Sequence, residues 1–152
     1  MAYIPKFFAY GGIHVHDNSD DQAIDSGSTY TKITAFADNE PSENVTSDAA
    51  NDKITFTNPG VYRVEGSFSF SSGTSNVIYF GAPFLDGVEQ DSIHFNRKVS
   101  VAGDVGNAGF TGILDITTTP VDLDFRVRHD NAGSVNITIT YANFNVSYLG
   151  QT

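Results

Sequence analysis

His14 and His16 are the residues whose type and spacing are best suited to binding a metal ion. They lie in the segment Ile13-His14-Val15-His16-Asp17, and imidazole is a common ligand of transition metals. Side chains two residues apart on a β-strand point the same way, so both imidazoles would share one face. Three copies of this face around a threefold axis would offer six nitrogens, which suit an octahedral transition-metal ion. Two surface histidines that bind no metal are the alternative interpretation.

Two acidic segments could bind calcium, because calcium prefers oxygen ligands. They are "DNSDD", which runs from Asp17 to Asp21, and "DNE", which runs from Asp38 to Glu40. Both lack the spaced glycine and the terminal glutamate of an EF-hand loop. Asp and Asn residues that cap turns explain the same segments without any ion.

No set of residues in the sequence predicts catalysis. There is no Gly-x-Ser-x-Gly segment, which marks the nucleophile of many hydrolases. His94 and His129 are isolated in the sequence, and the pair Asp122 and Asp124 stands beside two arginines on what should be a solvated strand face. A sugar-modifying enzyme on a cupin-like roll would need a metal motif that His14, His16 and one later histidine do not clearly supply. We therefore expect a protein that is not an enzyme.

The composition excludes several classes of partner. The formal net charge is −10 with only 8 Lys and Arg residues, which argues against binding to nucleic acids and to anionic membranes. Cysteine is absent, so no disulfide or thiolate metal site is possible. The start "MAYIPKFFAYGG" has no long apolar run, so we expect no signal peptide. Its 152 residues suit one domain.

The elements that must position these residues are β-strands, because helical periodicity is absent and turn signals recur. Gly11-Gly12 should end the first strand, and the polar residues 38–52 should form a loop, as should 102–109. The strands expected before residue 60 are Lys6 to Tyr10, Ile13 to His16, Tyr30 to Ala37 and Lys53 to Thr57. Those expected later include Asn76 to Leu85, Phe110 to Thr117, Val121 to Arg128 and Val135 to Leu149.

The stretch "NPGVYRVEGSFSFSSG", residues 58–73, is the clearest strand. Its apolar residues alternate with polar ones, which is typical of a strand with one face in the core and one in water. Residues Val121 to Arg128 alternate in the same way. The core residues predicted from the two segments are Tyr62, Val64, Phe68, Phe70, Leu123, Phe125 and Val127. The opposite face, with Arg63, Glu65, Ser67 and Ser69, should lie on the outside of any oligomer.

Two further strands depart from simple alternation. Residues 76–85 are apolar on both faces, so the second face, with Ile78 and Phe80, should be covered by another subunit or by a loop of the same chain. In the last strand the apolar parity switches at Ala142-Asn143, which predicts a β-bulge there. A strand of this length belongs in the centre of a sheet.

The order of these features resembles the tumour necrosis factor-like jelly roll, which also forms the globular heads of the complement first component. The resemblance rests on a short aromatic opening strand, Asn58-Pro59-Gly60-Val61-Tyr62, a hairpin at Asp86-Gly87, "FTGILDIT", "VDLDFRVRH" and the closing "ITYANFNVSYL". Tyr62 comes one residue later after Gly60 than is usual in the family. The implied fold is an all-β, antiparallel two-sheet jelly-roll sandwich of about 8–10 strands, with residues 1–152 as one domain and 1–12 as its N-terminal arm and first strand.

The resemblance also implies a homotrimer in which the sheet that holds the first and last strands faces the threefold axis. Short acidic trimers of this kind look like virion proteins of tailed bacteriophages, where they decorate or cement the outside of the capsid. The major capsid protein or another virion protein is then the expected partner, with Met1 to Phe8 as a docking arm. Candidates for the trimer interface are Phe7, Phe8, Phe56, Ile78, Phe80, Tyr141 and Tyr148.

Other functions stay open at this point. A phage fibre knob that binds a receptor or a glycan is one alternative, and a secreted trimeric signalling or recognition ligand is another. The His14 and His16 pair is similar to the His-x-His pairs on the axis of trimeric phage fibre tips.

Overall fold

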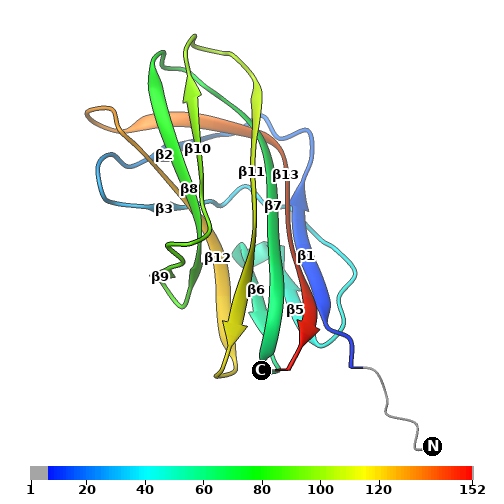
Figure 1. The fold of residues 1–152 in the computed structure, drawn as a ribbon. Coiled ribbons are helices and arrows are strands. Elements are labelled where there is room, and N and C mark those ends of the chain that lie inside the picture. Colours follow the sequence, from blue (N-terminus) through cyan, green and yellow to red (C-terminus); the bar gives the residue numbers. More distant parts are fainter. Residues whose placement is uncertain (1–6, 152) are drawn as a thin grey trace, which may run out of the picture.

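The computed structural model describes residues 7–151, which form thirteen β-strands and one 3-10 helix (Figure 1). In this part of the chain, no helix is long and apolar enough to cross a membrane. Three strands, β3, β4 and β9, have two residues each, which leaves ten longer ones. The elements are β1 (Tyr10–Val15), β2 (Asp21–Ile24), β3 (Thr31–Lys32), β4 (Asp38–Asn39), β5 (Val45–Asp48), η1 (Ala49–Asn51), β6 (Lys53–Phe56), β7 (Gly60–Ser72), β8 (Val77–Leu85), β9 (Val88–Glu89), β10 (Phe95–Val99), β11 (Gly106–Ile116), β12 (Val121–His129) and β13 (Val135–Gly150).

The strands form two sheets that pack face to face. Sheet A has the order β11-β7-β13-β1-β4, with β2 also paired to β13. Sheet B has the order β10-β8-β12-β6-β5, with β3 on β12 and β9 on β8. Neighbouring strands are antiparallel throughout the two orders. This arrangement confirms the predicted two-sheet, antiparallel jelly-roll sandwich.

The core between the sheets is built mainly from aromatic rings. Phe68 of sheet A stacks on Phe125 of sheet B, with ring centroids 4.1 Å apart. Phe95 and Phe144 pack around this pair. Each of the seven residues expected in the core is at least 97% buried, since none exceeds 3% exposure: Tyr62, Val64, Phe68, Phe70, Leu123, Phe125 and Val127.

Gly11 and Gly12 do not end a strand, as the sequence had suggested, but lie inside β1. A Cβ on Gly12 would lie 1.8 Å from Oδ1 of Asn145 on the neighbouring strand β13. The pair therefore permits close approach of β1 to its neighbours, and does not mark a turn. Phe7 to Ala9 are not in a strand, while Lys6 and most of the expected docking arm lie outside the described residues.

The boundaries of the turns were predicted less well than the alternating strands. Residues 38–52 were expected as a loop, yet they contain β4, β5 and η1. Polar side chains in this segment form hydrogen bonds with the backbone. For example, Asn39 Oδ1 accepts a hydrogen bond from the amide of Ala49 at 2.7 Å. Between Tyr30 and Ala37 only Thr31–Lys32 is a strand, and β11 begins at Gly106, inside the expected loop.

The second face of β8 is covered by the same chain. The guanidinium of Arg126 lies 4.6 Å from the ring centroid of Phe84, and that of Arg128 lies 4.1 Å from the ring centroid of Phe80. Tyr30 packs edge-on against Phe84 at 5.1 Å. Cation–π contacts therefore cover Phe84 and part of Phe80 on the face that the sequence had assigned to another subunit or to a loop, while Ile78 and Phe80 stay half-buried.

The strand β13 is central in sheet A, as its length predicted. Figure 1 shows it arching over the top of the sandwich before it descends between β7 and β1. Its register shifts between Ile139 and Tyr141, two residues before the predicted position. The bulge turns Tyr141 outward, where it is 50% exposed.

Candidate functional site

The two histidines meet an acidic residue because of the pairing between β1 and β4. His14 lies directly opposite Asp38 in the antiparallel register. Backbone hydrogen bonds hold the segment on both sides: the Ala37 amide donates to the His14 carbonyl at 2.9 Å, and the Glu40 amide donates to the Gly12 carbonyl at 2.8 Å. His16 comes directly after the end of β1, and its ring stacks on that of His14. The pairing of β4 with β1 thus brings two imidazoles and two carboxylates to one edge of sheet A.

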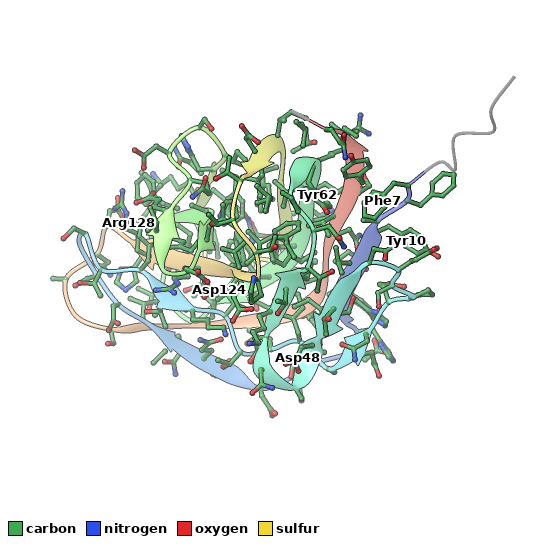
Figure 2. The ribbon with its side chains drawn as sticks, turned by 90° about the horizontal axis from the view of Figure 1, so that it is seen from below. Phe7, Tyr10, Asp48, Tyr62, Asp124 and Arg128 are labelled. Atoms are coloured by element: carbon green, nitrogen blue, oxygen red, sulfur yellow. The ribbon has the colours of Figure 1, made fainter. Side chains whose placement is uncertain are left out.

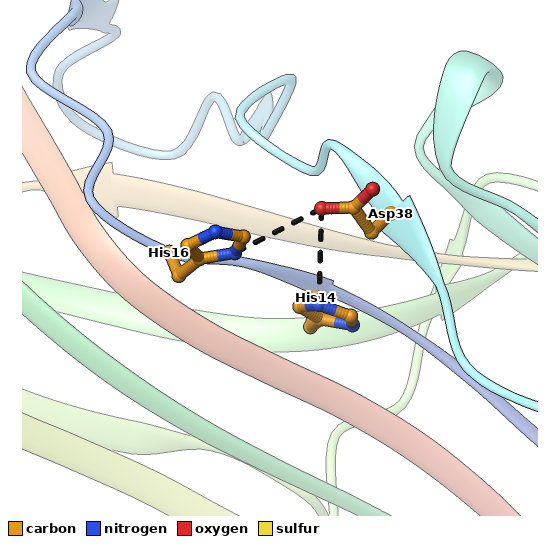
Figure 3. A group of neighbouring side chains, drawn as sticks. All are labelled: His14, His16 and Asp38. Carbon is orange, nitrogen blue, oxygen red and sulfur yellow. Dashed lines mark ion pairs between the residues drawn. The ribbon is translucent and has the colours of Figure 1, made fainter.

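The ligand-bearing atoms of this cluster converge (Figure 3). Oδ2 of Asp38 lies 3.8 Å from Nε2 of His14 and also 3.8 Å from Nδ1 of His16. The two imidazole rings are stacked, with centroids 5.9 Å apart and an angle of 27° between their planes. Two imidazole nitrogens and a carboxylate oxygen are ligands that suit a divalent transition metal.

Glu40 completes the cluster from the other side of His14. Its Oε1 lies 3.0 Å from Nδ1 of His14, although the contact is not aligned as a hydrogen bond. Nδ1 is shielded from solvent and has no hydrogen-bond partner among residues 7–151. His16 and Asp38 are more open, with side chains 62% and 53% exposed. The site is therefore anchored at His14 and open to solvent at His16.

The other segments considered for metal binding make bonds that stabilise turns and strands. Asn18 Oδ1 accepts a hydrogen bond from the Asp20 amide at 3.2 Å, which is an Asx turn. Asp17 accepts a bond from the hydroxyl of Tyr141, and Asp21 accepts one from Thr138. Of "DNE", Asp38 and Glu40 join the histidine cluster.

The residues considered for catalysis have separate structural partners. His129 is fully buried, and its Nδ1 accepts a hydrogen bond from the Asn131 amide while Nε2 lies 2.9 Å from the Ile24 carbonyl. Asp122 bonds Lys53 and Thr55. Asp124 is only 9% exposed and is paired with Arg126, so its expected place on a solvated face was wrong. These acids and bases do not converge on a shared centre.

The outer face of sheet A forms a second candidate site. Across it, Ile113 of β11 lies opposite Arg63 of β7, and Arg63 lies opposite Ser147 of β13. Ser147 in turn lies opposite Tyr10 of β1. Ile113 and Tyr10 are 54% and 43% exposed. The face therefore carries exposed apolar side chains at both of its sides.

A shallow hollow lies in the middle of this face. Gly109, which lies opposite Ser67, leaves it without a side chain at one position, and polar groups surround it. The residues that line it are Glu65, Gly66, Ser67, Gly109, Phe110, Thr111, Asn143 and Asn145. Arg63, Glu65 and Ser67 thus share a face with the first and last strands. The expectation that those strands face a threefold axis conflicts with the expectation that Arg63 and its neighbours lie outside it.

The residues expected at a trimer interface occupy different parts of the molecule. Phe56 is fully buried within the chain, so it belongs to the core. Tyr148 is half-buried between Phe7 and Tyr62, with ring centroids 4.8 Å and 5.4 Å away. Figure 2 shows Phe7 and Tyr10 on one side of the molecule and Arg128 on the other. Phe7, Phe8 and Tyr141 are exposed, whereas Ile78 and Phe80 are half-buried on sheet B.

Comparisons with known proteins find similar folds without similar sequences. No model of a known protein family matches the chain, and no curated protein sequence matches it. The globular domain of zebrafish complement 1qA protein superposes with a TM-score of 0.62 at 14% identity, covering 95% of this chain and 98% of that one. For the PRD1 vertex protein P5 the TM-score is 0.56 at 10% identity, with coverages of 93% and 73%.

A tumour necrosis factor structure is also similar. The Eiger TNF from S. frugiperda superposes with a TM-score of 0.53 at 9% identity, covering 95% of each chain. At such identities the likeness concerns the fold alone. The chain therefore has the jelly-roll fold that these tumour necrosis factor and complement structures share.

Proposed function

We propose that the chain is a non-enzymatic structural protein of a virion, which forms a homotrimer and decorates or cements the outside of a phage capsid. The observation that carries the proposal is the outer face of sheet A. It is broad, spans four long strands, and exposes Ile113, Tyr10 and Tyr141. Tyrosines on an exposed face are favourable anchors for an interface, because they bury a large area at a small cost in side-chain entropy.

The charge and the fold of the chain favour this role over the alternatives. The net charge of −10 disfavours contact with nucleic acid, and the two carboxylates considered for catalysis, Asp122 and Asp124, are paired with Lys53 and Arg126. The similarity to the PRD1 vertex protein supports a place in a virion. A closed cyclic trimer would present three identical surfaces to a threefold position of a capsid lattice.

On this proposal the face with Arg63, Glu65 and Ser67 lies inside the trimer. The alternating pattern of β7 pointed to the outside, because these side chains are polar. Interfaces that are not obligate are about as polar as the rest of a protein surface, so polarity alone does not exclude them. The position of β7 between β11 and β13 supports this placement, since these strands share one face.

The experiment is sedimentation analysis of the purified chain together with a capsid-binding assay. We expect a trimer that binds particles lacking it, and the variant Ile113→Arg should sediment as a monomer. The matched control is Val88→Arg, because Val88 is 65% exposed on β9 of sheet B and should not affect assembly. A wild-type chain that is monomeric and does not bind such particles would rule the proposal out.

A further inference from the structure

We propose that each chain binds one divalent transition-metal ion of the zinc type through His14, His16 and Asp38. The ligand atoms are Nε2 of His14, Nδ1 of His16 and Oδ2 of Asp38, and Glu40 holds His14 in place from behind. The inference rests on contacts within one chain, so it does not depend on the proposed trimer or on the proposed role in a virion. It also replaces the six-nitrogen arrangement on a threefold axis.

The distances between the three groups are close to those that a metal requires. Two ligand atoms of a tetrahedral zinc ion, each about 2.0 Å from the metal, lie about 3.3 Å apart. The two contacts of Asp38 Oδ2 are 3.8 Å each, and the ligand atoms of all three residues lie within 4.8 Å of one another. Small side-chain rotations close the difference. The backbone need not move, because the pairing of His14 with Asp38 already places both on adjacent strands.

Glu40 acts on His14 in the way that outer carboxylates act in known metal sites. A histidine that binds a metal through one nitrogen usually donates the N–H of its other nitrogen to a carboxylate or a carbonyl, which fixes its tautomer and orientation. Here Oε1 of Glu40 lies 3.0 Å from Nδ1. This shielded nitrogen has no hydrogen-bond partner in the described chain. Metal binding at Nε2 would leave the proton on Nδ1, and a slight ring rotation would give that proton its acceptor.

The ligand types select the class of metal. Imidazole nitrogens favour zinc and its neighbours, whereas calcium and magnesium prefer sites made of oxygen alone. The cluster has two imidazoles and one ligating carboxylate, so it suits zinc, cobalt or nickel. His16 and Asp38 are more than half exposed, which leaves room for water as a further ligand.

An ion pair without metal is the competing explanation for the cluster. Protonated histidines would also be attracted to Asp38 and Glu40, and no metal would then be needed. Only a neutral imidazole can bind a metal ion. The metal-site explanation therefore predicts that the chain binds zinc, and the ion-pair explanation does not require it. A direct measurement of zinc binding to the metal-free chain therefore separates them.

The test uses the whole chain without a histidine tag, freed of metal by a chelator and titrated with zinc in a calorimeter. We expect one zinc ion per chain, and with cobalt the intense visible absorption of a four-coordinate site. His16→Ala and Asp38→Asn should each weaken zinc binding at least tenfold. Glu40→Gln should weaken it by about 10-fold to 100-fold while the cobalt spectrum keeps its form.

The control variant is His94→Ala, because His94 is exposed elsewhere on the surface and its ring has one polar contact within residues 7–151, with the Asp91 carbonyl. It should bind zinc as the wild type does. Zinc binding that is absent, or that is unchanged in His16→Ala and Asp38→Asn, would overturn the proposal. The monomeric variant Ile113→Arg should keep its zinc, because β11 and β4 are at opposite edges of sheet A. The two proposals can therefore fail separately.

Discussion

Gly81 shows at the scale of one residue how tightly the aromatic core is packed. A Cβ at this position would lie 2.6 Å from the ring of Phe125 and 2.7 Å from the ring of Phe95. Overpacking of this kind costs about 1–3 kcal/mol, so Gly81→Ala should lower the free energy of unfolding by that amount. Gly73→Ala is the matched control, since nothing lies within 4 Å of its added Cβ. Denaturant unfolding measures both, and equal midpoints would contradict the prediction.

Asp122 links the stability of the chain to pH. Burial raises the pKa of its carboxyl, but hydrogen bonds from Lys53 and Thr55 and the charge of Lys53 outweigh burial, so the net pKa is lowered. A lowered pKa in the folded state stabilises the protein above the unfolded value of about 3.9. This contribution is lost as the pH falls through the lower, folded value.

The variant Asp122→Asn should therefore lose less stability than the wild type between about pH 4 and pH 2. Thr55→Val removes one of the two donors to the carboxylate and should give an intermediate slope. Unfolding free energies measured in denaturant across this range test the order of the three proteins. If wild type and Asp122→Asn lose stability in parallel, the prediction is wrong.

At the scale of the element, β12 stabilises the outer side of sheet B. Arg126 forms two hydrogen bonds with Asp124, at 2.7 Å and 2.9 Å, and covers the ring of Phe84. Arg126→Ala would leave a largely buried carboxylate without its partner and should cost about 2 kcal/mol. Arg126→Lys should not restore the loss, because an ammonium cannot make the planar pair of bonds.

The control for Arg126 is Arg63→Ala on the exposed face of β7. Exposed substitutions usually change stability by about 0.5 kcal/mol or less. Both substitutions are made in the monomeric variant Ile113→Arg, so that denaturant unfolding compares their stabilities without any effect on assembly. A loss at Arg63 as large as that at Arg126 would show that the ion pair with Asp124 is not what stabilises sheet B.

The alternating strands could be predicted from sequence because one face of each is in the core. Tyr62 and Phe68 on β7, and Leu123 on β12, follow a period of two, and all are buried. The pattern failed where side-chain bonds or close backbone approach determine the structure. Asn39 accepts a hydrogen bond from the Ala49 amide within a polar segment that was expected to be a loop. Gly12 lies within a strand, where a larger residue would clash with the side chain of Asn145.

The candidate metal site was only half visible in the sequence. The spacing of His14 and His16 places both side chains on one face, whichever strand lies next to them. Local periodicity was therefore enough to predict that they lie close together. Asp38 lies 24 residues after His14 in the chain and joins the histidines through the register of β4 on β1. A pairing of that range leaves no local pattern, and Asp38 was instead assigned to an acidic segment that could hold calcium.

At the scale of the whole molecule, assembly should make thermal stability depend on protein concentration. A trimer that unfolds to separate chains is stabilised by mass action, so its midpoint temperature rises as the chain is concentrated. A single folded chain has no such dependence. We expect the wild-type midpoint to rise over about a hundredfold range of concentration, and the midpoint of Ile113→Arg to stay constant. Val88→Arg should behave as the wild type. A wild-type midpoint that does not move would mean that the outer face of sheet A is not buried by other copies, and would leave a protein of another kind as its partner.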